Sequence, residues 1–163
     1  MRKILVFAPL SLMLMFAVGR ATPQEAAPPA HTLAMPADLA WGPPPPFFPA
    51  GAKFVILFGD PGKPGPVAVR MQMPAGYRIA PHWHPGTEQV TVISGSVAFG
   101  MGDTFDEKTM KTLGAGGYAV MPAEMRHYVK AKTAAMIEVH GIGPFAINYV
   151  NPADAPNAAP PAK

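Results

Sequence analysis

Two histidines separated by a single residue are the first candidates for chemistry in this chain. On a β-strand, residues i and i+2 share a face, so His82 and His84 should project together, with Trp83 opposite. Glu88 follows beyond a Pro-Gly bend, where a turn can return its carboxylate to the two imidazoles. Neutral imidazoles and a carboxylate suit a divalent first-row transition metal. His127, near the start of a later predicted strand, could supply a fourth ligand.

From the residues alone, these histidines could also have no role in metal binding. A histidine on a strand is commonly solvated or hydrogen-bonded to backbone, and His-x-His near a glutamate also occurs in β-rich proteins without a metal. The other two of the five histidines, His31 and His140, are not expected to bind a metal. The chain has no cysteine, which excludes disulfides, thiolate metal sites and cysteine nucleophiles.

Short strands must position these side chains. Between residues 50 and 150, apolar or alternating runs recur with glycine, proline and other turn formers between them. The predicted strands are Lys53–Phe58, Val67–Met73, Val90–Ile93, Val97–Phe99, Ala119–Met121, His127–Ala131, Ala135–Val139 and Phe145–Val150. Only Asp106–Lys111 is predicted to be helical, as a single turn. This pattern predicts an all-β domain, either a sandwich or a barrel.

The histidine segment resembles the first motif of the cupin superfamily. That motif reads Gly, five residues, His-x-His, three residues, Glu, six residues, Gly. Every spacing is met here, by Gly76, His82, His84, Glu88 and Gly95.

The second cupin motif is matched in part. It reads Gly, five residues, Pro-x-Gly, two residues, His, three residues, Asn, and Gly116, Pro122 and His127 stand at the corresponding positions. Glu124 replaces the second Gly, in the tight turn before the strand of His127. Ala131 replaces the Asn, a polar group that many members present near the site.

The resemblance covers roughly residues 50–150 and implies a single-domain double-stranded β-helix, a jelly-roll barrel with a metal inside one end. It implies one divalent transition metal (Mn, Fe, Ni, Co or Zn), and the residues do not select among these. The implied ligands are His82, His84, Glu88 and His127. Open coordination positions would then be left for water, oxygen or a bidentate substrate.

Strand parity predicts an apolar environment for the ion, because Val90, Val92, Val129 and Ala131 should face the same way as the nearest ligands. The sequence leaves the direction of two polar pairs open. Arg70 with Gln72, and Glu138 with His140, could contact a substrate or could face solvent or a subunit interface.

Three functions are compatible with this site. The first is a metal-dependent enzyme of the oxygenase, decarboxylase, isomerase or lyase type, acting on a small organic substrate in the barrel mouth. The second is a metal-loaded module that binds or senses a small molecule without catalysis. The third, a metal-free structural cupin, is disfavoured by the complete ligand set. Catalytic residues beyond the metal ligands are not predicted.

The rest of the chain divides around this domain. Residues 1–21 read as a signal peptide, 22–49 as a proline-rich linker or arm, and 151–163 as a flexible tail. Trp41, Phe47 and Phe48 interrupt the linker, so residues 41–49 should pack against the barrel; a proline-rich motif for a partner is the alternative. Three of the thirteen basic residues precede residue 22, and the remaining ten are matched by ten acids, which argues against nucleic-acid binding.

The chain is expected to be exported, to the periplasm or beyond. Arg2 and Lys3 precede an apolar run over residues 4–19, which small residues follow. An uncleaved membrane anchor is the alternative, but the run is short for a span and Pro9 interrupts it. After cleavage no stable membrane insertion is expected.

A homodimer is expected as well. By parity with the two histidines of the first motif, Ile79 and Trp83 should point away from the metal and offer an apolar outer surface to a second subunit.

Export makes a direct prediction about the mature chain. Mass spectrometry of the protein from its native host should find an N-terminus near Arg20 or Thr22, because Ala17-Val18-Gly19 and Gly19-Arg20-Ala21 are both small-x-small sites. An intact Met1 in the soluble cytosolic fraction would contradict export.

Overall fold

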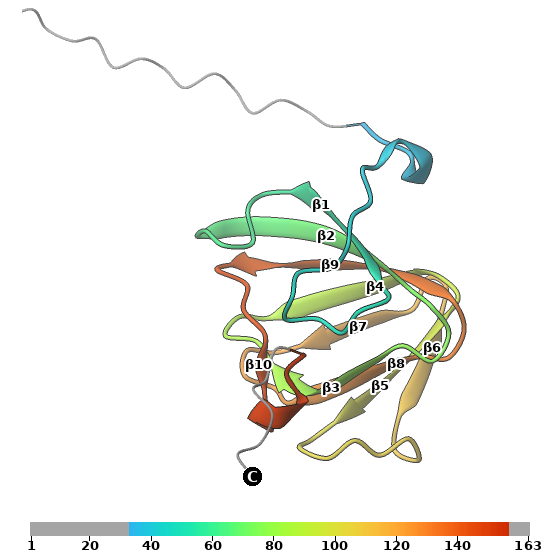
Figure 1. The fold of residues 1–163 in the computed structure, drawn as a ribbon, viewed down its shortest axis with the longest axis vertical. Helices are drawn as coiled ribbons and strands as arrows, with labels where there is room; N and C mark the ends of the chain where they lie inside the picture. The colour runs from blue at the N-terminus through green and yellow to red at the C-terminus, as the bar shows by residue number, and fades with distance from the viewer. Residues whose placement is uncertain (1–32, 157–163) are drawn as a thin grey trace, which may run out of the picture. The chain divides into compact units, whose positions relative to one another are not determined.

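The computed structural model describes residues 33–156, which form two antiparallel β-sheets packed face to face (Figure 1). The strands are β1 (Lys53–Phe58), β2 (Gly65–Met73), β3 (Arg78–Trp83), β4 (Glu88–Ser94), β5 (Ser96–Met101), β6 (Lys111–Gly114), β7 (Tyr118–Met121), β8 (His127–Ala131), β9 (Ala135–Gly143) and β10 (Asn148–Tyr149). One sheet has the order β1-β2-β9-β4-β7 and the other β10-β3-β8-β5-β6. The predicted all-β jelly roll is confirmed.

Two short 3₁₀ turns flank the strands, η1 (Pro36–Asp38) and η2 (Pro152–Asp154). The predicted signal peptide, the first part of the proline-rich linker and the end of the tail lie outside the described residues. Within residues 33–156, no helix has the length and apolarity needed to cross a bilayer.

All eight predicted strands are present, although Phe145–Val150 is reduced to the two residues of β10. The predicted helical turn over Asp106–Lys111 is wrong. Residues 107–108 form a hydrogen-bonded turn, and Lys111 begins β6, which pairs with β5. The sequence of β6, Lys-Thr-Leu-Gly, is short and mostly polar, so it carried no periodic signal.

The core lies between the sheets and follows the alternation seen in the sequence. In β2, Val67, Val69, Met71 and Met73 are buried, whereas Arg70 and Gln72 are only partly covered. The inner faces of β4, β5, β8 and β9 complete the core with mainly Val, Ile, Ala and Phe. Burial of this apolar surface, at roughly 25 cal/mol per Å², drives the sheets together.

The arm, defined here as residues 41–49, packs against this barrel as predicted. Gly42 and Phe54 exchange two backbone hydrogen bonds of 3.0 and 2.9 Å, which attach the arm to β1. The ring of Phe48 packs on that of Phe54, with centroids 6.2 Å apart. In Figure 1 the arm is part of the teal segment between η1 and β1.

A β-bulge in β3 overturns one expectation about the outer surface. Ile79 pairs with Val129 and His82 with His127, so β3 carries one extra residue between these pairs. The extra residue breaks the strand parity, and Ile79 is 4% exposed and faces the interior together with His82. Pro81 lies within the bulge, where its missing N–H costs no ladder hydrogen bond. Ile79 is therefore unavailable to a subunit interface.

The turn before β8 forms although Glu124 stands where the second cupin motif has a glycine. Glu124 has φ +62°, the left-handed conformation that the glycine of the second cupin motif would adopt without strain. Its backbone N–H donates to the carbonyl of His84 at 2.8 Å, which ties this turn to the end of β3. The side chain is exposed, so the position accepts glutamate at a conformational cost.

Glu124→Gly should therefore stabilise the fold, by up to about 1 kcal/mol, because it relieves the left-handed strain. Ala123→Gly is the matched control one residue earlier, and it should destabilise by roughly 0.5–1 kcal/mol through added chain entropy. Urea unfolding monitored by circular dichroism measures both. Equal destabilisation by the two substitutions would contradict this account of the turn.

Candidate metal centre

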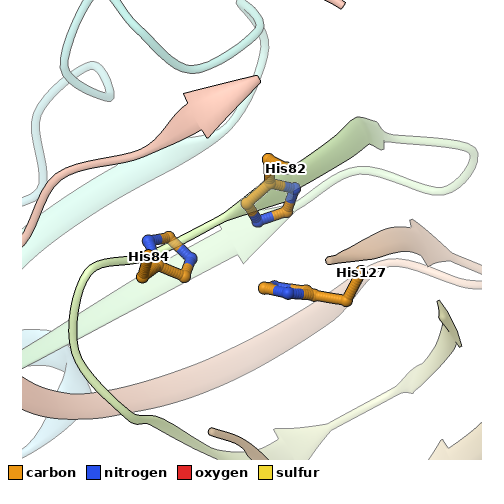
Figure 2. A group of neighbouring side chains, drawn as sticks. All are labelled: His82, His84 and His127. Carbon is orange, nitrogen blue, oxygen red and sulfur yellow. The ribbon is translucent and has the colours of Figure 1, made fainter. Parts of the chain in front are cut away.

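Three imidazoles from the end of β3, the residue that follows it and the start of β8 converge inside the barrel (Figure 2). His82 lies in β3, His84 directly follows that strand, and His127 begins β8, opposite His82 in the ladder. Their ligand atoms all lie within 4.8 Å of one another. The ring centroids of His82 and His127 are 4.1 Å apart, and none of the three residues is more than 3% exposed.

Backbone carbonyls determine which nitrogen of each ring faces the site. Each Nδ1 lies within hydrogen-bond distance of a carbonyl oxygen: His82 to Ala80 at 2.7 Å, His84 to Ala146 at 2.7 Å and His127 to Met125 at 3.0 Å. A carbonyl can only accept, so each Nδ1 must carry the proton. In the neutral ring, each Nε2 then holds a free lone pair.

Glu88 adds a carboxylate from the opposite sheet, at the start of β4. Its Oε2 lies 3.6 Å from Nε2 of His84 and 3.2 Å from Nε2 of His127. Glu88 is 8% exposed and lies beside the group that the three histidines form. The four residues that the cupin motifs imply as metal ligands therefore lie close together.

These neighbouring atoms are all acceptors. Nε2 of His84 and Nε2 of His127 are buried and have no hydrogen-bond partner in the described structure. Lone pairs and a carboxylate oxygen at such distances repel one another unless a cation lies among them. The donor set, imidazole nitrogens with one carboxylate oxygen, fits a divalent transition metal.

A proton is a poor substitute for that cation. Burial lowers the pKa of His82 well below its ordinary value, and the neighbouring His127 and His84 lower it further. Burial also lowers the pKa of His84, against the opposing influence of the Glu88 carboxylate. These two imidazoles are therefore neutral near pH 7, the form in which a histidine binds a metal.

The histidines open onto a cavity of about 320 Å³ between the sheets. The polar side chains in its wall are the three histidines and Glu88; the remaining lining is apolar. That lining comprises Pro45, Phe47, Phe48, Phe54, Ile56, Pro61, Gly62, Val67, Val69, Met71, Ile79, Val90, Phe99, Val129, Ile137, Val139 and Phe145. Of the four residues predicted to surround the ion, Val90 and Val129 line the cavity, whereas Val92 and Ala131 are buried in the core and do not line it.

The polar pairs whose direction was open lie on the outward face of the β2–β9 ladder. Arg70 Nε donates to Glu138 Oε2 at 2.6 Å, and His140 Nε2 lies 2.8 Å from Glu138 Oε1. Neither these residues nor Gln72 line the cavity. They form or flank a cross-strand charge network and take no part in the histidine site.

Sequence reasoning missed the contribution of the segment before β10. The ring of Phe145 stacks on His84, with centroids 4.6 Å apart and an interplanar angle of 25°. The next residue, Ala146, supplies the carbonyl that orients the same histidine. Gly141 leaves room for this ring, since a Cβ there would lie 2.6 Å from it. The aromatic residue was visible in the sequence, but its partner across 61 positions was not.

The comparisons with known proteins agree with this architecture. Residues 69–141 match the family model described as a cupin domain. No curated protein sequence matches the chain significantly.

Among solved structures, the polyketide cyclase RemF from Streptomyces resistomycificus is similar, with a TM-score of 0.63 and 14% identity over 75% of this chain and 87% of that one. An acetylacetone dioxygenase from Acinetobacter johnsonii has a TM-score of 0.58 and 16% identity, over 77% and 81%. An RmlC-like cupin from Shewanella frigidimarina has a TM-score of 0.54 and 15% identity, over 69% and 91%. At these identities the likeness concerns the fold. The sequence match shows that residues 69–141 of this chain form a cupin domain, and the two-sheet barrel has the fold of such domains.

Proposed function

We propose that this protein is a metal-dependent enzyme that acts on a small organic molecule in the barrel cavity. One divalent transition metal would be held by His82, His84, Glu88 and His127. The observation that carries the proposal is the set of inward-facing acceptor atoms, buried without a donor, at the wall of a cavity. A metal bound there would act as a Lewis acid or activate oxygen for the bound molecule.

The position of the acceptor atoms favours a reactive site over a structural one. Structural metal sites are closed on all sides by protein ligands, whereas catalytic sites keep a position open. Here the histidine nitrogens border a cavity of about 320 Å³, large enough for a small organic ligand.

The chain's own residues would orient the metal and exclude water. The carbonyls of Ala80, Ala146 and Met125 hold the three imidazoles in one tautomer, so little reorganisation is needed on binding. Phe145 restrains the plane of the His84 ring by stacking. The described cavity wall offers no acid or base besides the histidines and Glu88, so proton transfer would involve these groups, water or the ligand itself.

Export and self-association are part of the proposal. The apolar segment that follows Arg2 and Lys3 supports a periplasmic or secreted protein, in which this site would meet small molecules outside the cytosol. A homodimer is also proposed; Trp83, which is half-buried and does not line the cavity, is the remaining candidate of the two residues named for its interface.

The first test is metal content. Protein purified without an affinity tag should contain about one transition-metal ion per chain by mass spectrometry, and the metal should raise the melting temperature by mass action. The His82→Ala/His84→Ala variant should lose more than about 100-fold in affinity, because even outer-shell changes cost 10–100-fold. His140→Ala is the matched control, since that histidine lies on the outward face.

Metal retained at full stoichiometry in the double variant would show that the site is elsewhere. With a loaded protein in hand, oxygen uptake and product analysis over a panel of small organic substrates would distinguish an enzyme from a binding module. Saturable binding with no turnover on any substrate would favour the module.

The second test is the acid sensitivity of the metal-free protein. The folded-state pKa values of His82 and His84 are lowered, whereas the unfolded chain titrates near ~6.5. Below that pH the unfolded state binds more protons, so the free energy of unfolding should fall as pH drops from about 7 toward the lowered folded values. Denaturant titrations at several pH values measure this, and the loss should be smaller in His82→Asn. Stability that rises over this range would contradict the neutral, buried histidines.

A further inference from the structure

The arm forms part of the cavity wall as well as packing on the barrel. Pro45, Phe47 and Phe48 line the cavity, and all three lie outside the segment that matches the cupin domain. Phe47 is 42% exposed although it lines the cavity, so it stands at the boundary between the cavity and solvent. The rings of Phe47 and Phe48 contact each other, with centroids 5.2 Å apart. This part of the wall belongs to a loop rather than to a sheet.

Tyrosine hydroxyls hold the arm in place. The Tyr149 hydroxyl donates to the carbonyl of Phe47 at 2.9 Å, and the Tyr77 hydroxyl donates to the carbonyl of Pro49 at 2.6 Å. Prolines 43–46 have no N–H, so this part of the arm cannot pair with a strand edge as a donor. Its attachment therefore depends on carbonyl acceptors and a few bonds, which local motion can break and remake.

One of these tyrosines lies beside the histidine site. Tyr149 lies in β10 opposite His82 of β3, and the two rings are 6.1 Å apart. A displacement of the arm would therefore affect Tyr149 beside His82. A ligand bound beside His82 would in turn affect the tyrosine that holds the arm.

The cavity itself restricts what can lie under the arm. The described wall contains no lysine or arginine and, beyond the histidines and Glu88, no polar side chain. A charged group away from the histidines would lose its hydration without gaining a partner, at a cost of several kcal/mol. An apolar body would instead gain from burial against the aromatic rings.

We propose that residues 43–49 are a latched lid, held by Tyr149 and Tyr77, which selects a ligand with an apolar body and one polar head directed at the histidines. The direction of the head rests on the proposed metal site. The lid and its apolar preference do not.

The latch is tested without any metal. The Phe48 amide donates to Pro45 within the arm at 2.9 Å, so its hydrogen exchange reports local opening of the arm, which release of the latch should favour. In metal-free protein, Tyr149→Phe should speed this exchange about five- to tenfold, the effect of losing one hydrogen bond. Toluene, an apolar probe, should slow it in both proteins. Exchange at Phe48 that responds to neither toluene nor the substitution would overturn the lid.

Selection is tested on metal-loaded protein with two hydroxamates that share a chelating head, benzohydroxamate with a phenyl tail and succinyl monohydroxamate with a carboxylate tail. The phenyl compound should bind at least about tenfold more tightly, since only its tail is compatible with an uncharged wall. Phe47→Ala should reduce that preference at least about threefold, which corresponds to part of one ring contact. Phe58→Ala is the matched control, an exposed phenylalanine outside the cavity.

The two proposals can fail separately. Equal or tighter binding of the carboxylate tail would overturn the apolar selection while leaving the metal site intact. If neither hydroxamate binds because no metal is held, the proposed enzyme fails, and toluene titration of wild type against Phe47→Ala still decides the apolar preference. Equal toluene affinity in these two proteins would overturn the role of the arm.

Discussion

The structure of this site depends on three hydrogen bonds between histidine Nδ1 atoms and backbone carbonyls. They place the proton of each neutral ring on the outer nitrogen and leave the inner nitrogen as an acceptor. These carbonyls belong to β3, to the turn before β8 and to the segment before β10, so the backbone beside the site sets the orientation of each ring. Acceptors held together in this way, beside the Glu88 carboxylate, repel one another unless a cation binds among them, and the described residues place no donor there.

Two backbone irregularities, one in β3 and one in the turn before β8, make that arrangement possible. The bulge in β3 turns His82 to the same side as Ile79, so an apolar residue and a polar residue share the interior wall. The left-handed turn at Glu124 brings the chain into β8 at the register that sets His127 opposite His82. Glycine would adopt this turn without strain. That glutamate does so here indicates that the surrounding hydrogen bonds, including that to the His84 carbonyl, outweigh its cost.

The cavity shows how a common fold acquires an individual binding site. The two sheets supply the histidines and most of the apolar wall, whereas the arm and the segment before β10 add aromatic rings at its border. Loops that cover the mouth of a rigid barrel can change in sequence without disturbing the ligands beneath them. The chemistry of the wall, uncharged apart from the site itself, is therefore set as much by these loops as by the strands.

Eight of the ten strands could be predicted from the sequence, and the resemblance to the cupin motifs implied the jelly-roll class and the four side chains that lie together. These depend on local signals: alternation along β2, turn formers between strands, and motif spacing around His82, His84 and Glu88. Where local signals were weak, as in the polar strand β6, the prediction failed. The inward direction of Ile79 became clear only from the tertiary structure, because the alternation of apolar and polar residues in a sequence does not reveal a β-bulge. The tertiary structure alone decided that Phe145 stacks on His84 and that Phe47 borders the cavity, since each contact joins residues far apart in the chain. Such pairings arise from the closure of the barrel, which no short window of sequence encodes.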